Sequence, residues 1–128
     1  MRRLEVSLQV DAPASAARDV LVDLDRWPDW GPSVRGAELH DGGRRLRAAA
    51  HGTVTTAVGL SVPFRVNRWV AGERWAWNVA GLPATSHVVR SLGPDRCEVA
   101  FGVPRFAAPY LVVCRVALTR IAELAVTA

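Results

Sequence analysis

The sequence predicts an α+β protein in which a seven-stranded antiparallel sheet packs against a long C-terminal helix. Residues 4–10 alternate strictly between apolar and polar side chains, which is typical of a strand with one buried face. Six further short runs rich in Val, Leu, Phe and Trp follow between residues 34 and 103, and an amphipathic segment covers residues 107–125. A sheet and a helix that each have one apolar face must cover each other.

The segment after the first strand predicts two short helices. Asp11-Ala12-Pro13 interrupts the alternation, and apolar residues then recur at helical spacing at Ala17, Val20, Leu21 and Leu24. This spacing predicts a helix that begins at Pro13 or Ala14. Residues 26–32 contain two prolines and a glycine, which favour a short second helix or a turn. Its two tryptophans, Trp27 and Trp30, are expected to close one end of the core.

Turn signals divide the middle of the chain into six predicted strands, at residues 34–40, 44–54, 60–70, 74–80, 86–92 and 97–103. The connections between them are short, so we expect antiparallel neighbours in a meander. Residues 107–125 contain no glycine, and their single proline, Pro109, lies in the first turn. One stripe of this predicted helix is apolar and consists of Tyr110, Val113, Cys114, Ala117, Leu118, Ile121 and Leu124.

Composition restricts the classes of protein that the chain can belong to. The 128 residues are 50% hydrophobic, which is enough to bury a core, and we expect a single domain over residues 1–128. All 16 basic residues are arginines, and they are scattered rather than gathered on one stripe, so we expect no nucleic-acid binding. No apolar run is long enough to cross a membrane. The first strand carries Glu5, Ser7 and Gln9 and lacks the apolar core of a signal peptide, so we expect a cytoplasmic protein.

The sequence lacks the motifs that are typical of metal binding, phosphate binding and serine-nucleophile catalysis. Cys97 and Cys114 fall in a predicted strand and a predicted helix without metal-ligand spacing, and we expect them to be small buried hydrophobic residues. The sequence contains no phosphate-binding glycine loop, no zinc motif and no nucleophile elbow. We therefore expect neither a cofactor nor a metal ion, and the oligomeric state is left open.

Several short sequence motifs, together with this order of elements, resemble those of the START-like superfamily. This superfamily is also called SRPBCC, helix-grip or Bet v 1-like and is often labelled polyketide cyclase/dehydrase. The motifs are Val10-Asp11-Ala12-Pro13, the segment VLVDLDRWPDW at residues 20–30, VPFRV at residues 62–66 and WAWNVAG at residues 75–81. The resemblance implies a helix-grip fold, in which a curved sheet wraps round the C-terminal helix and leaves a cavity between them. Its members include lipid carriers, polyketide aromatase/cyclases, hormone receptors and ring-hydroxylase subunits, so function must be argued from the cavity.

Strand parity predicts which side chains face that cavity. Phe64 and Val66 share one face of their strand, and continuing the parity places Arg68 on it too. A buried Arg68 would need an anionic or carbonyl partner; the alternative is that the strand ends or bulges there and Arg68 reaches solvent. Trp75 and Trp77 share a face and are candidates for an aromatic wall or for the core. The full predicted lining is Phe64, Val66, Arg68, Trp75, Trp77, His87, Val89, Phe101, Tyr110, Cys114, Ala117 and Ile121.

Three functions are consistent with this pattern. The first is binding of a hydrophobic or aromatic small molecule, such as a lipid, polyketide or isoprenoid, between sheet and helix. The second is a polyketide aromatase/cyclase or dehydratase in which His87 acts as acid or base, Arg68 polarises a carbonyl and Tyr110 assists. His87 has an alternative role as a core residue bonded to backbone. The third function is an interaction module that stabilises a partner protein.

Overall fold

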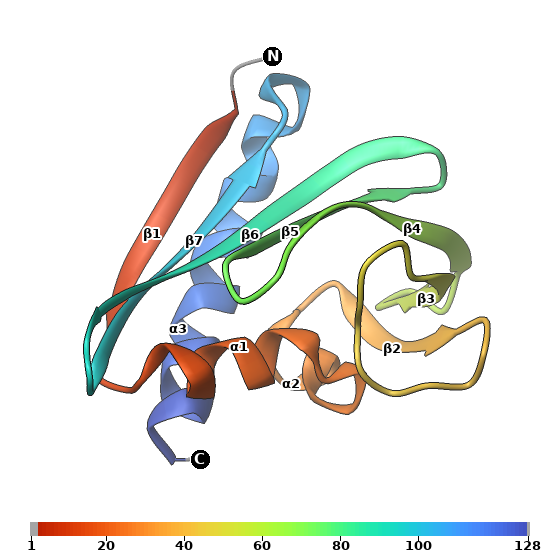
Figure 1. The fold of residues 1–128 in the computed structure, drawn as a ribbon. Coiled ribbons are helices and arrows are strands. Elements are labelled where there is room, and N and C mark those ends of the chain that lie inside the picture. Colours follow the sequence, from red (N-terminus) through yellow and green to blue (C-terminus); the bar gives the residue numbers. More distant parts are fainter. Residues whose placement is uncertain (1–2, 128) are drawn as a thin grey trace.

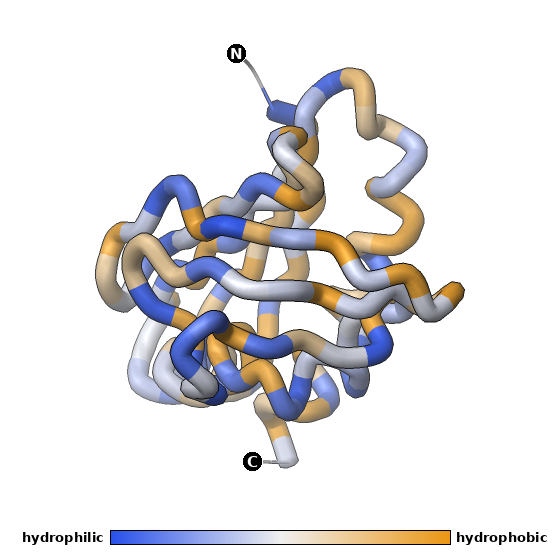
Figure 2. Tube along the Cα trace, turned by 90° about the vertical axis from the view of Figure 1, so that its right-hand side faces the viewer, coloured by the Kyte–Doolittle hydropathy of each residue, from blue (hydrophilic) through white to orange (hydrophobic). Residues whose placement is uncertain are grey.

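The computed structural model describes residues 3–127 and contains one antiparallel sheet of seven strands in the order β1-β7-β6-β5-β4-β3-β2 (Figure 1). The first strand therefore joins the last at one edge, while the others follow one another as a meander. The strands are β1 (Leu4–Val10), β2 (Val34–Leu39), β3 (His51–Thr56), β4 (Ser61–Val70), β5 (Arg74–Val79), β6 (Leu82–Gly93) and β7 (Arg96–Val103). Figure 2 shows hydrophobic and hydrophilic residues interspersed along the chain, and in β1 the two kinds alternate strictly.

The helices gather on one face of this sheet. They are α1 (Ala14–Val22), the 3₁₀ turn η1 (Leu24–Arg26), α2 (Trp27–Trp30), the 3₁₀ helix η2 (Arg105–Tyr110) and α3 (Leu111–Thr127). The long helix α3 packs against β1, β7, α1 and α2 (Figure 1). The predicted fold, a curved antiparallel sheet that holds a long C-terminal helix, is thereby confirmed. None of the helices in the described part of the chain is long and apolar enough to cross a membrane.

The prediction of a strand over residues 44–54 is wrong for its first half. Only His51–Thr56 belongs to the sheet, and the preceding residues form a loop that bonds to the end of α1 instead. The Leu46 amide donates to the Val22 carbonyl at 2.8 Å, and the Leu46 side chain is buried as an anchor. Ala49 has a φ of 58°, a left-handed conformation that interrupts an extended strand.

Two further boundaries differ from the prediction by four residues each. β6 begins at Leu82 rather than at residue 86, because the hairpin turn consists only of Ala80 and Gly81, which both have positive φ as a two-residue turn of type I′ requires. The C-terminal helix begins at Leu111 rather than at residue 107. Ala107 has non-helical backbone angles, so the segment before α3 is a separate 3₁₀ helix that contains Pro109.

Candidate functional site

A cavity of about 450 Å³ lies at one end of the sheet, where β2 begins, where β3, β5 and β7 end, and where β6 and η2 begin. None of its lining residues is charged, and most are aliphatic. Its polar groups are the hydroxyls of Ser33, Thr56, Thr85 and Tyr110 and the indole N–H of Trp77. We call it the main cavity, and its lining is Ser33, Val34, Val54, Thr56, Ala57, Val58, Trp77, Val79, Pro83, Ala84, Thr85, Val103, Pro104, Ala107 and Tyr110.

The mouth of the main cavity is formed by turns that carry apolar residues. Val58, in the turn between β3 and β4, lines the cavity and is 87% exposed. Leu82 and Phe106, next to the lining residues Pro83 and Ala107, are 62% and 64% exposed. Exposed apolar side chains beside a concave apolar surface are typical of a binding site.

The centre of the space between sheet and helix is filled instead of hollow. Trp27, only 1% exposed, lies parallel to Trp75 with ring centroids 6.0 Å apart and meets Trp77 edge-on at 5.3 Å. Phe64 packs against Trp27 at 5.9 Å. These aromatic rings occupy the region in which the sequence placed the cavity, so the main cavity is confined to the end of the sheet beyond them.

Local chemistry explains why the two tryptophans of α2 point into the core. The Trp27 and Trp30 indoles donate through Nε1 to the carbonyls of Leu21 and Val20, at 2.9 and 3.2 Å. These carbonyls belong to the last turn of α1, where backbone acceptors lack partners within the helix. The short turn η1 between the helices is closed by the Asp23 carboxylate, which accepts from the Asp25 amide at 3.0 Å.

A smaller hollow of about 30 Å³, which we call the inner hollow, lies next to the main cavity and has room for about one or two water molecules. It is lined by the aromatic cluster and by α3, and it shares Ser33, Val34, Trp77, Thr85 and Tyr110 with the main cavity. The Trp75 indole, which belongs to its lining, has the only buried side-chain N–H or oxygen among residues 3–127 without a hydrogen-bond partner.

A chain of hydrogen bonds runs along this shared wall. Trp77 Nε1 donates to Thr85 Oγ1 at 2.9 Å, and Thr85 Oγ1 lies 2.8 Å from His87 Nε2. His87 Nδ1 lies 3.3 Å from the Trp75 carbonyl, which can only accept, so Nδ1 carries the proton. In the neutral ring Nε2 then accepts from the Thr85 hydroxyl. Every polar atom of Thr85 and His87 is thereby satisfied.

His87 is held in its neutral form. Its pKa is lowered to about 3, mainly by burial; the hydrogen bond to the Trp75 carbonyl opposes this shift and the nearby charge of Arg3 adds to it. A general base functions best with a pKa near the working pH, so this imidazole is poorly suited to that role at neutral pH.

The second polar contact of the cavity joins Ser33 and Tyr110, whose hydroxyl oxygens are 2.5 Å apart. Tyr110 lies in η2, one residue before α3, and lines both hollows. Partial burial raises the pKa of its phenol, and the bond from Ser33 opposes that shift. Tyr110 is therefore protonated and serves as a hydrogen-bonding group.

Apart from Arg68, the predicted lining residues fall into three groups in the structure. Trp77 and Tyr110 line the main cavity and the inner hollow. A second group lines the inner hollow alone: Trp75, His87, Phe101, Cys114 and Ala117. A third group is buried in the core and lines neither hollow: Phe64, Val66, Val89 and Ile121. Both cysteines are buried and free, as predicted.

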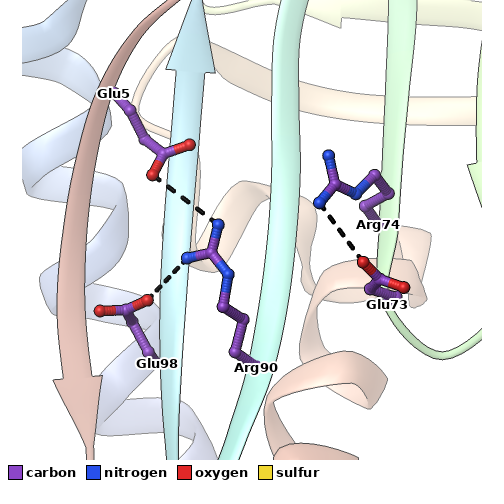
Figure 3. A network of polar contacts seen from close by, with 5 residues as sticks. All are labelled: Glu5, Glu73, Arg74, Arg90 and Glu98. Carbon is purple, nitrogen blue, oxygen red and sulfur yellow. Dashed lines mark hydrogen bonds and ion pairs between the residues drawn. The ribbon is translucent and has the colours of Figure 1, made fainter.

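Arg68 does not face the cavity, and the inward orientation predicted for it is wrong. The pairing of β4 with β5 shifts between Val66 and Arg68, so a β-bulge reverses the parity at this point. Arg68 is exposed on the outer face of the sheet, together with charged residues of the neighbouring strands. Figure 3 shows that face, with Glu5, Arg74 and Arg90 in front of the strands and the helices behind them.

The three residues of the cyclase hypothesis consequently do not form one site. Arg68 lies on the opposite side of the sheet from Tyr110 and His87, and His87 is bonded on both ring nitrogens. Within residues 3–127, no three side chains among His, Cys, Asp and Glu are grouped as metal ligands.

Sequence reasoning missed most of the main cavity because its walls come from turns and strand ends. Parity arguments apply only inside regular strands, whereas Ala57, Val58 and Pro83 lie in or beside turns. The available signal was the apolar character of those turns, at residues 57–60 and 81–83, since surface turns are ordinarily rich in polar residues.

The curved sheet, the long C-terminal helix that it holds and the apolar cavity beside them define a helix-grip protein. A family described as polyketide cyclase / dehydrase and lipid transport has a sequence model that matches residues 1–100, and the chain belongs to this family. No protein of curated function matches the chain in sequence.

Solved structures share the fold at low sequence identity. A hypothetical protein of Helicobacter pylori has a TM-score of 0.76 and 12% identity, with coverage of 97% of this chain and 88% of the other. An uncharacterized protein of Bacillus thuringiensis has a TM-score of 0.72 and 14% identity, with coverage of 98% and 99%. The di-domain ARO/CYC protein BexL of the BE-7585A biosynthetic pathway has a TM-score of 0.70 and 14% identity, and the similarity covers 96% of this chain and 46% of BexL.

Proposed function

We propose that the protein binds a hydrophobic or aromatic small molecule, such as a lipid, a polyketide or an isoprenoid, in the main cavity. The observation that carries this proposal is a cavity of about 450 Å³ whose lining contains no charged side chain. Small-molecule sites are typically clefts of about 300–1,000 Å³ with mostly apolar walls and a few polar groups. The family description, which names lipid transport beside polyketide cyclisation, supports a ligand of this kind.

Binding is favoured over a cyclase that uses His87, Arg68 and Tyr110. An acid–base mechanism needs its groups within hydrogen-bond reach of one substrate. Arg68 belongs to the outer face, and His87 has a pKa lowered to about 3 by burial. Of the three, Tyr110 alone lines the main cavity, where its hydroxyl is placed to orient a bound molecule.

The test uses a substitution that fills the main cavity and a matched substitution outside it, and compares how well each variant binds an apolar probe. Val79→Trp adds an indole to a lining residue of β5, whereas Val70→Trp makes the same change at the partly exposed end of β4, outside the lining. The probe is N-phenyl-1-naphthylamine, an uncharged fluorophore. We expect saturable binding to the unmodified protein, binding at least about 10-fold weaker to Val79→Trp because the space is occupied, and unchanged binding to Val70→Trp.

Native mass spectrometry of the protein purified from its own host, followed by denaturing extraction, gives the second measurement. We expect a stoichiometric apolar compound that is lost in Val79→Trp and retained in Val70→Trp. Equal probe binding by both variants would overturn the proposal. So would the absence of both saturable probe binding and a copurified compound, and that result would favour the interaction-module hypothesis.

A further inference from the structure

The outer face of the sheet, opposite α3, carries a second hollow of about 450 Å³ that shares no lining residue with the main cavity. We call it the outer hollow. Side chains from the N-terminal end of the chain and from β1, β4, β5 and β6 surround it. Its polar lining residues are Arg3, Glu5, Asn67, Arg68, Arg74 and Ser86.

At Gly102, β7 lies between Glu5 of β1 and Ser86 of β6, which both line the outer hollow, and it carries no side chain there. On β7, Ala100 pairs with Val88 and Gly102 pairs with Ser86. A Cβ atom at Gly102 would lie 2.5 Å from Ser86 Oγ, so a larger residue there would displace the Ser86 hydroxyl. A floor of small residues is thereby left between long side chains from the neighbouring strands.

A β-bulge directs additional polar groups into the outer hollow. Asn67 and Arg68 are consecutive, yet both line it, although neighbouring residues of a regular strand point to opposite faces. The pairing of β4 with β5 passes from Val66 to Arg68 and leaves Asn67 without a partner in the register. Bulges of this kind re-aim side chains and are frequent beside functional sites.

The charges around the outer hollow are unbalanced. Its lining contains three arginines and one glutamate, which leaves two positive charges without a counter-charge in the lining. Arg3 is held by its Nη1, which donates to the Ala84 carbonyl at 2.7 Å. Arg68 takes part in no ion pair and no side-chain hydrogen bond among residues 3–127.

Two lining residues, Arg74 and Glu5, have charged neighbours, but their ion pairs leave other hydrogen-bonding atoms of these side chains unused within the described part of the chain. Among residues 3–127, Arg74 forms one ion pair, with the adjacent Glu73 at 3.3 Å. Glu5 lies 3.9 Å from Arg90, whose closer partner is Glu98 at 2.6 Å (Figure 3). Figure 3 shows Glu5 on the β1 side and Arg74 on the β5 side, so the outer hollow is framed by one carboxylate and by guanidinium groups.

We propose that the outer hollow binds a small soluble molecule that carries a phosphate monoester. Guanidinium groups are suited to phosphate because their planar N–H donors match its oxygen atoms in paired hydrogen bonds. A phosphate monoester carries a charge of about −1.5 to −2 at neutral pH, which complements a lining that holds more arginines than glutamates. The remaining volume, with Asn67 and Ser86 on its wall, would hold the organic part. This site is independent of the main cavity.

The test is calorimetric titration with ribose 5-phosphate, and ribose serves as the matched uncharged ligand. We expect saturable binding of the phosphate and none of ribose. Arg68→Gln should weaken binding about 10-fold or more, since it removes charge-assisted hydrogen bonds. Arg65→Gln removes the same charge from an exposed residue of the same strand that lies outside the hollow, and should leave affinity within about twofold.

A third variant should change affinity in the opposite direction. Glu5→Gln removes the one carboxylate of the lining and should strengthen binding several-fold. Absence of saturable binding to the unmodified protein, or equal weakening by Arg65→Gln and Arg68→Gln, overturns the proposal. Vesicles that contain phosphatidic acid supply the same phosphate chemistry on a membrane. Binding to such vesicles without binding to ribose 5-phosphate would overturn the assignment to a soluble ligand.

Discussion

The imidazole of His87 lies stacked on the indole of Trp75, with ring centroids 3.8 Å apart and planes inclined by 26°, while His87 Nδ1 donates to the carbonyl of the same tryptophan. The two residues are cross-strand partners on β5 and β6. One strand pair therefore supplies both a ring contact and a hydrogen bond. This arrangement fixes the tautomer of His87, whose side chain is buried.

We expect the protein to become less stable as the pH is lowered, because of His87. Its folded pKa, lowered by burial to about 3, lies below the unfolded value of about 6.5. The unfolded chain therefore takes up a proton before the folded chain does. The stabilisation is complete above about pH 6.5 and is lost progressively down to about pH 3, at roughly 1 kcal/mol per pH unit.

Denaturant unfolding between pH 7 and pH 5 measures this effect above the range in which most carboxylates titrate. His87→Gln should be less stable at pH 7 but show a smaller loss on acidification than the unmodified protein. His51→Gln, which changes an exposed imidazole, should lose as much stability on acidification as the unmodified protein does. An equal pH dependence in the His87 variant would contradict the assignment.

Thr85→Val should destabilise the protein by about 2–4 kcal/mol. The substitution removes one hydroxyl and leaves two groups without partners, the indole N–H of Trp77 and Nε2 of His87. Thr85→Ser keeps the hydroxyl and should recover most of the loss. Thr53→Val, on an exposed strand position, controls for the general effect of the change. A serine variant as unstable as the valine variant would show that the methyl group and not the hydroxyl matters.

Trp27→Phe should lower the free energy of unfolding by about 2–4 kcal/mol. The smaller ring leaves a gap in the aromatic cluster and withdraws the donor from the Leu21 carbonyl at the end of α1. Trp69→Phe makes the same chemical change at a half-buried residue of β4 that makes no side-chain hydrogen bond among the described residues, and should cost less than about 1 kcal/mol. Thermal and denaturant unfolding of both variants provide the comparison.

Gly52→Ala should be strongly destabilising, by about 1–3 kcal/mol or more, because its Cβ would lie 2.0 Å from the carbonyl oxygen of Glu38 on the paired strand. Backbone cannot move aside as a flexible side chain would. Gly36→Ala on the neighbouring strand β2 meets no atom within 4 Å and should be nearly neutral. Equal stability of the two variants would show that β2 and β3 pair less closely than the structure indicates.

The regular parts of the fold could be predicted from residue patterns. The alternation in residues 4–10 and the apolar stripe of the C-terminal helix identified β1 and α3, because each pattern repeats with the period of its own backbone. Residues 44–50 misled the prediction for the opposite reason. Leu46 is apolar but is an isolated anchor bonded to α1, and no periodicity distinguishes such an anchor from the inward residue of a strand.

The positions of the main cavity, the inner hollow and the outer hollow follow from the tertiary structure and not from local sequence patterns. Residue patterns were sufficient for the order of the elements and the buried face of most strands, since hydrophobic periodicity is a local property of the chain. They could not determine that the bulge after Val66 turns Arg68 outward, or that Trp27 fills the centre of the core. Those outcomes depend on pairing register and on packing between segments far apart in the chain, and a shift of one residue in register is enough to move a side chain from one face of the sheet to the other.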